Sequence, residues 1–115
     1  MQAFNVTQQR TLASVLIVAD SFFRSLRGLI GTASLEEGHG LWIFPCQSVH
    51  TFWMRFPIDV VFLDKDYKII HLVKNLKPYR VSKHLSKASS VIELPISTIK
   101  ETGTQVGDEI QIVQR

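Results

Sequence analysis

The chain has very little cysteine, and its single cysteine, Cys46, excludes a disulfide within the chain. No stretch approaches the roughly 18–20 apolar residues that a helix needs to span a bilayer. The longest apolar-rich stretch near the start, residues 12–19, is interrupted by Ser14 and is short for a signal-peptide core. These absences favour a reduced, cytoplasmic setting, and leave a mature exported domain open as the alternative.

Several familiar sequence motifs are also missing. The chain contains no phosphate-binding loop, no dinucleotide-binding fingerprint and no serine nucleophile elbow. It shows no repeat, linker or low-complexity segment. With 115 residues, 45% of them hydrophobic, the chain suits one domain spanning residues 1–115 that buries a core without disulfides or metal.

The net charge of +3 is unevenly distributed. One segment without any acidic residue contains five cations: Lys74, Lys77, Arg80, Lys83 and Lys87. The segment is either a solvated loop or a lip that attracts anions. Only Tyr79 is available there for base stacking, and the overall charge is modest, so nucleic-acid binding is disfavoured.

Patterns of β-branched and aromatic residues between turn residues predict mainly strands. We expect strands at residues 4–7, 11–19, 41–44, 49–56, 58–63, 67–73, 90–94 and 109–113, with 58–63 and 67–73 paired. Helical spacing predicts one main helix at residues 21–30, and Pro95 opens a short helical turn that ends at Gly103. The expected fold is a compact, β-rich α+β domain with a small, barrel-like, mostly antiparallel sheet.

The segment PCQSVHTFWMRFPIDVVFLD, residues 45–64, is the best candidate for a site. Burying a polar or charged group costs free energy unless the group is paired. Four titratable side chains and one tryptophan stand here among apolar residues. We take them as candidate ligand-binding residues: His50, Trp53, Arg55, Asp59 and Asp64.

Alternation along this segment places Trp53 and Arg55 on the same strand face. Together they could hold a planar or anionic ligand by stacking and bidentate hydrogen bonds. The structural alternative is an ion pair between Arg55 and Asp59. In either case we predict that Asp59 is buried and held by Arg55 or by backbone amides. The pair of Trp42 and Phe44 is interpreted as core.

Metal binding and nucleophilic catalysis are weaker interpretations of the same segment. Cys46 and His50 form one loose C-x3-H pair, whereas structural zinc normally has four ligands. The same two residues lack a clear third member that would orient the histidine for catalysis. We therefore predict no metal, no cofactor and no assigned catalytic residue.

Several short signatures occur in order along the chain. They are Arg27-Gly28-Leu29, the strand at 40–45 ending in proline, the stretch at 50–54, Ile58-Asp59, Leu63-Asp64, Lys77-Pro78, Glu93-Leu94-Pro95 and Gly107-Asp108. In this order they resemble an uncharacterised prokaryotic family, the domain-of-unknown-function family 192. The resemblance implies a small β-rich domain and brings no established activity. Ser97 and Tyr67 stand where the family pattern has glycines, which raises a question about the local turn geometry.

Two classes of function follow from these observations. The leading hypothesis is a non-catalytic binding or accessory domain that uses the surface of Trp53 and Arg55 beside the basic loop. Its partner would be a small anionic or sugar-like ligand or a protein segment. The alternative is a small hydrolase-type enzyme that uses His50 with Asp59 or Asp64 as acid–base groups.

Overall fold

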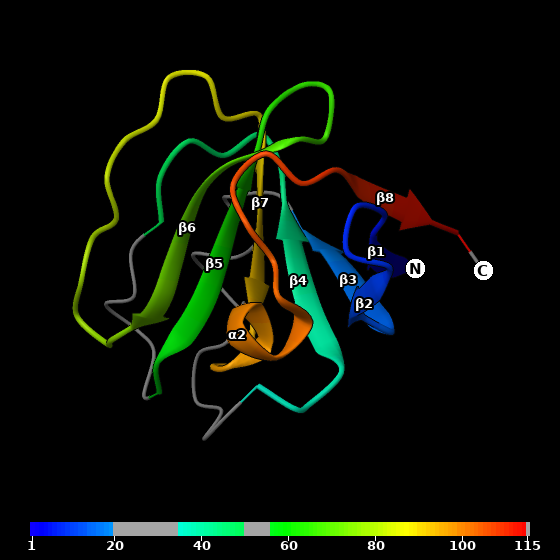
Figure 1. Ribbon diagram of the computed structural model, residues 1–115. Helices are drawn as coiled ribbons and strands as arrows, with labels where there is room; N and C mark the ends of the chain where they lie inside the picture. Colours follow the sequence, from blue (N-terminus) through cyan, green and yellow to red (C-terminus); the bar gives the residue numbers. More distant parts are fainter. Residues whose placement is uncertain (20–34, 50–55, 115) are drawn as a thin grey trace.

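The computed structural model describes residues 1–19, 35–49 and 56–114. Within these ranges the chain forms a three-stranded sheet, a five-stranded sheet and the short helix α2 (Figure 1). No helix in these ranges is long and apolar enough to cross a membrane.

The smaller sheet has the strand order β2-β1-β8 and is antiparallel throughout. Its strands are β1 (Gln2–Asn5), β2 (Arg10–Ala13) and β8 (Ile110–Val113). Alternate residues of β1, Ala3 and Asn5, are completely buried, as expected for a strand with one face on a core. The sheet therefore joins the two ends of the described chain.

The larger sheet has the strand order β3-β4-β7-β5-β6. Its strands are β3 (Val15–Ala19), β4 (His39–Ile43), β5 (Ile58–Leu63), β6 (Ile69–Leu76) and β7 (Ser90–Leu94). β3 and β4 run parallel, and the other neighbouring strands run antiparallel. Asp59 lies on β5 of this sheet, and Asp64 directly follows the same strand.

Both faces of the larger sheet are covered, which explains why β5 and β7 are buried along their whole length. On one face, Val61 and Ile92 pack in a core with Ile99 of α2 and Ile110 of the smaller sheet. On the other face, a second core includes Ile58, Val60, Phe62 and Val91, together with Cys46, Val49 and Ala88 from the connecting segments. A continuous apolar run such as IDVVFL is typical of such a strand.

Helix α2 (Thr98–Thr102) is a single short turn between β7 and β8. It is preceded by Ser97 and followed by Gly103, and both adopt left-handed backbone conformations, with φ of 75° and 66°. The predicted short helical turn that ends at Gly103 is confirmed. A left-handed φ is unfavourable for a residue with a Cβ atom, so Ser97 occupies a position that suits glycine.

The β-rich, mostly antiparallel α+β class is confirmed. The strands at 58–63 and 90–94 and the pairing of β5 with β6 are confirmed as well. Closure into a barrel is not confirmed, since the described strands form two separate sheets.

Other predictions of strand limits were wrong or lie outside the described residues. The strand predicted at 11–19 is two strands, because the chain turns at Ser14, whose backbone N–H and hydroxyl both donate to the carbonyl of Gly38 at 2.8 and 3.2 Å. The strand predicted at 4–7 ends at Asn5, since residues 6–9 form a turn. The predicted helix at 21–30 lies outside the described residues, as does most of the strand predicted at 49–56, whose end residues Val49 and Phe56 belong to no strand.

Candidate functional site

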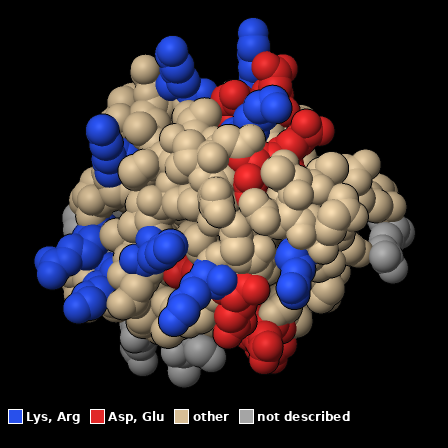
Figure 2. Space-filling model, viewed as in Figure 1, with Lys and Arg blue, Asp and Glu red and all other residues tan. Residues whose placement is uncertain are grey.

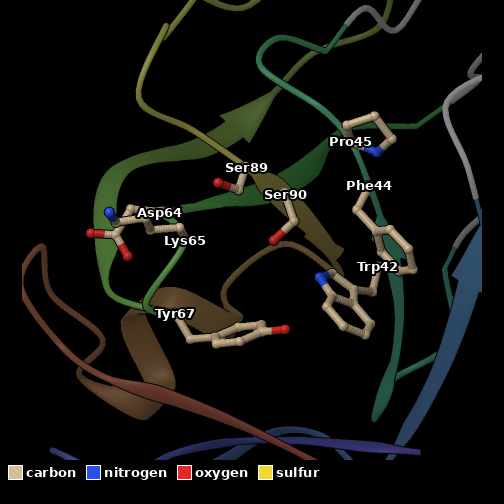
Figure 3. Close-up of a pocket in the computed structure, with 8 residues that line it drawn as sticks. All are labelled: Trp42, Phe44, Pro45, Asp64, Lys65, Tyr67, Ser89 and Ser90. Atoms are coloured by element: carbon tan, nitrogen blue, oxygen red, sulfur yellow. The ribbon is translucent and has the colours of Figure 1, made fainter.

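A pocket of about 380 Å³ opens between the end of β4, the start of β7 and the turn after β5 (Figure 3). This size lies in the range of small-molecule sites, which begins at about 300 Å³. The pocket is lined by Trp42, Phe44, Pro45, Asp64, Lys65, Tyr67, Ser89 and Ser90. A hollow of about 440 Å³ beside Cys46 and Ala88 has no aromatic ring among the described residues of its wall. We therefore take the aromatic pocket as the candidate site.

Three aromatic rings form the apolar wall of the pocket. The ring centroids of Trp42 and Phe44 are 4.7 Å apart, and those of Trp42 and Tyr67 are 6.1 Å apart. The two pairs are tilted by 54° and 52°, so neither pair forms a parallel sandwich. Phe44 and Tyr67 are 41% and 40% exposed, which leaves ring surface for a ligand. The interpretation of Trp42 and Phe44 as core was therefore wrong for Phe44, whereas Trp42 packs partly against the core.

Tyr67 reaches the pocket from a tightly bonded turn. The Asp64 carboxylate accepts hydrogen bonds from the N–H groups of Asp66 and Lys68 at 2.8 and 3.0 Å. The backbone of Tyr67 donates to the Asp64 carbonyl at 3.1 Å and accepts from Ile110 at 2.9 Å. These bonds hold Tyr67 at a φ of 61°, a costly value for an aromatic residue. The prediction that this strand begins at Tyr67 was wrong, because β6 begins at Ile69.

Two polar groups of the pocket wall stand out, the indole of Trp42 and the hydroxyl of Ser90, and the first has no hydrogen-bond partner among the described residues. The indole Nε1 of Trp42 is buried and unpaired. The hydroxyl of Ser90, a residue that is only 4% exposed, points into the space between Trp42 and Tyr67 (Figure 3). Because buried polar groups are nearly always paired, unpaired ones in a pocket wall indicate positions for a ligand or ordered water.

Asp59 is buried at 1% exposure and bonded through both oxygens. Its Oδ1 accepts from the backbone N–H of Asn75, and its Oδ2 accepts from the backbone N–H of Ile99, each at 3.0 Å. The predicted burial and anchoring by backbone amides are confirmed. Asp59 ties β5 to the end of β6 and to α2, beside a small hollow of about 210 Å³ that Lys74 and Lys100 also line.

The two candidate carboxylates are not brought together. Asp59 is near the start of β5 and Asp64 directly follows its end, so about five residues of strand, on the order of 16 Å, separate them. His50, Trp53 and Arg55 lie outside the described residues. In the part of the chain that is described, no group of three or more His, Cys, Asp or Glu residues could hold a metal ion. Cys46 is buried, and its thiol donates to the carbonyl of Ser48 at 3.0 Å.

The five cations of the basic segment are all exposed. Lys74 lies on β6, and the other four lie on the connection to β7. On the face shown in Figure 2, several basic side chains gather at the lower left, and others lie apart from them at the upper left and the top. The backbone of the connection is held in place, since Ser82 donates to the carbonyl of Val49 at 2.7 Å and Leu85 donates to that of Gln47 at 2.9 Å. The connection then continues into Ser89 and Ser90 of the aromatic pocket.

A second polar network joins the two ends of the chain away from the pocket. Asp108, 5% exposed, accepts hydrogen bonds from the side chains of Asn5 and Gln8 and from the backbone N–H of Gln105. Burial acts to raise the pKa of Asp108, but the hydrogen bonds from Asn5, Gln105 and Gln8 outweigh it, so the pKa is lowered from its usual value.

Of the candidate ligand-binding residues chosen from the sequence, Asp64 lines this pocket. The aromatic residues of the pocket wall were not chosen. Trp42 and Phe44 are two residues apart, which places their side chains on one face of a strand. That signal does not distinguish a buried face from a pocket wall. Tyr67 carried a further signal, since it stands in a turn where the family pattern has glycine, and the structure shows that the position has a left-handed backbone.

The fold and pocket define a class of small, β-rich α+β domains with two sheets and an aromatic hollow at one sheet end. The family model DUF192, described as "Uncharacterized ACR, COG1430", matches residues 4–112. The chain therefore belongs to the DUF192 family, whose function is not characterised. A UPF0127 protein from Thermococcus sibiricus is 32% identical over 111 residues, which cover 92% of this chain and 71% of the relative. A UPF0127 protein from Pyrococcus abyssi is 31% identical over 100 residues, 82% of each chain.

Two solved structures share the fold. A protein of unknown function from Novosphingobium aromaticivorans superimposes with a TM-score of 0.80 at 16% identity, over 96% of this chain and 82% of the other. A protein from Sinorhizobium meliloti, described as a candidate transcription regulator, superimposes with a TM-score of 0.76 at 20% identity, over 96% of this chain and 89% of the other. At these identities the likeness concerns the fold alone.

Proposed function

We propose that this chain is a non-catalytic binding domain that holds a small ligand in the pocket of Trp42, Phe44 and Tyr67. The observation that carries the proposal is the combination, in one concavity, of exposed ring surface with an unpaired buried indole nitrogen beside the hydroxyl of Ser90. Apolar walls with a few placed polar groups are typical of small-molecule sites. The left-handed backbone of Tyr67 also fits, because unfavourable backbone conformations cluster at functional sites.

The described carboxylates favour binding over catalysis. Both oxygens of Asp59 accept hydrogen bonds from backbone amides, so this side chain is engaged in holding the fold. One oxygen of Asp64 organises the turn that carries Tyr67. A general acid or base must reach the proton that it transfers. The enzyme alternative, in which His50 acts with Asp59 or Asp64, would require Asp59 to leave its backbone partners, or Asp64 to act through the one oxygen that does not hold the turn.

The proposal keeps the remaining expectations from the sequence. His50, Trp53 and Arg55 stay candidate ligand residues, and the basic loop stays a candidate for attracting an anionic partner or protein segment. We propose a single domain over residues 1–115 in the cytoplasm, in which the two sheets pack in a barrel-like manner. Nucleic acid stays disfavoured as a partner.

A ligand screen by saturation-transfer NMR tests the proposal. The purified protein is mixed with pools of neutral sugars, nucleotides, amino acids, carboxylic acids and quaternary amines. Each hit is then measured against Tyr67→Gly, which removes a ring while retaining the two backbone hydrogen bonds of this residue. We expect at least one hit whose binding falls at least tenfold in this variant.

Tyr79→Gly is the matched control. Tyr79 is also an exposed tyrosine with a left-handed backbone, at a φ of 62°, but it does not line the pocket. The control variant should bind each hit as the wild type does. Equal binding by the Tyr67 variant, or no hit in any pool, would contradict the proposal. Incubating each hit and recording its spectrum over a day tests the enzyme alternative, since turnover that His50→Ala abolishes would favour a hydrolase.

A further inference from the structure

We infer that the aromatic pocket takes a neutral sugar ring. This inference rests on the proposed function and names the chemical class of the ligand. It follows from three observations: the tilt of the rings, the unpaired indole nitrogen with the serine hydroxyl beside it, and the balance of charge at the rim.

The tilt of the rings argues against a flat aromatic ligand. A nucleobase or similar ring is held best between parallel ring faces, and Trp42 makes angles of 54° and 52° with its two aromatic neighbours, Phe44 and Tyr67. A pyranose is puckered and presents C–H groups on one face and at its edge. Such a ring can contact two tilted walls at once, and each contact contributes dispersion attraction.

The two polar groups of the pocket wall, of which the indole nitrogen is unpaired, call for a ligand with hydroxyl groups. The Nε1–H of Trp42 can only donate a hydrogen bond, whereas the hydroxyl of Ser90 can both donate and accept. In Figure 3 these two groups point toward the same part of the pocket. A sugar hydroxyl is both donor and acceptor, so one such group can serve the indole and the serine together. The indole nitrogen is buried, so this contact also requires a small shift of the Trp42 side chain.

The charge at the rim argues against ions. The pocket is lined by one acidic and one basic residue, Asp64 and Lys65, whose charges offset one another. Among the described residues, no arginine lines it to receive a carboxylate or phosphate in a bidentate manner. A quaternary ammonium would favour the rings, but the offset charges at the rim give it no net attraction, and it would leave the indole N–H of Trp42 without an acceptor. A neutral, hydroxylated ring satisfies each of these groups.

The test is a titration with a panel of methyl pyranosides and disaccharides made of glucose, galactose, mannose and N-acetylglucosamine. Saturation-transfer NMR measures the affinity of wild type, Tyr67→Gly, Ser90→Ala and the control Tyr79→Gly. We expect at least one sugar to bind wild type and the control equally. We expect Tyr67→Gly to weaken it at least tenfold and Ser90→Ala to weaken it about three- to tenfold, the range for one hydrogen bond.

The monosaccharide and disaccharide arms distinguish a free sugar from a glycan chain. If only disaccharides bind, the pocket recognises a unit within a glycan. If no sugar binds and a ligand of another class is lost in Tyr67→Gly, the inference is overturned while the proposed function stands. If a sugar binds with equal affinity to wild type and both pocket variants, the inference is overturned as well. If neither a sugar nor any other class binds, both fail.

Discussion

Replacing Asp59 by alanine should remove the bonds that tie β5 to β6 and to α2. The Asp59 carboxylate accepts one hydrogen bond from Asn75 and one from Ile99, and the residue is 1% exposed. Hydrogen bonds to a charged group contribute about 1.5–3 kcal/mol each, and their loss leaves the buried N–H of Ile99 unpaired. The substitution should therefore lower the free energy of unfolding by roughly 3–6 kcal/mol.

This loss is large for a chain of 115 residues. Domains of ordinary stability unfold with only about 5–15 kcal/mol. With an unfolding entropy of about 2.1 cal/mol/K per residue, the melting temperature should fall by roughly 12–25 °C. Circular dichroism during heating measures the shift, and urea titration measures the free energy. Asp59→Asn keeps one acceptor oxygen and should lose about half as much.

Asp66→Ala is the control for removing a carboxylate at the other end of the same strand. Its side chain is exposed and it should stay within about 0.5 kcal/mol of wild type. Hydrogen exchange adds a local readout, because the amides of Asn75 and Ile99 should exchange faster in Asp59→Asn. A melting temperature for Asp59→Ala within error of wild type would refute the anchoring role.

Three further predictions follow from the described residues. Ser97→Gly should raise the free energy of unfolding by up to about 1 kcal/mol, because glycine adopts the φ of 75° without a Cβ penalty. Part of this gain is lost because glycine gives the unfolded chain more conformational entropy. A lower free energy of unfolding in urea titration would contradict this prediction. The hydrogen-bonded Asp108 has a lowered pKa in the folded protein. Its contribution to stability should therefore be complete above its pKa in the unfolded chain, about 3.9, and be lost as the pH falls through its pKa in the folded protein. Asp108→Asn should be less stable than wild type at pH 7 and should show a weaker loss of stability between pH 5 and pH 2. Changing Lys83 and Lys87 to glutamine should alter the affinity for a neutral sugar less than twofold at low salt, since the screened field of exposed charges acts on charged ligands; a severalfold loss would show that the basic loop attracts an anion.

The fold followed from the sequence where pattern and burial agree. The run at 58–63 and the paired strand after it were predicted because uninterrupted apolar residues mark a strand covered on both faces. The break at Ser14 was missed because a single serine within an apolar run is also compatible with one continuous strand. The hydrogen bonds of Ser14 to Gly38, which turn the chain, join residues 24 apart in sequence. Such long-range contacts leave no local signal.

The site was harder to predict for a related reason. Charge among apolar residues correctly marked Asp59 as unusual, but the pattern could not tell that backbone amides bind both of its oxygens. Trp42, Tyr67 and Ser90 come from three separate parts of the chain and meet only through the register of β4, β7 and the turn after β5. Aromatic residues on strands more often pack in a core, so the exposed ring faces became visible only in the structure.

The most direct measurement of the central claim is the indole N–H signal of Trp42 in a proton–nitrogen correlation spectrum during ligand titration. The chain has two tryptophans, so the signal is assigned by its absence in Trp42→Phe. Because this indole nitrogen is unpaired in the pocket wall, a ligand that fills the pocket should shift the signal in proportion to occupancy. The same titration should leave the signal unmoved in Tyr67→Gly. Saturated binding of a screened ligand with an unchanged Trp42 signal would contradict the assignment of the pocket as the binding site.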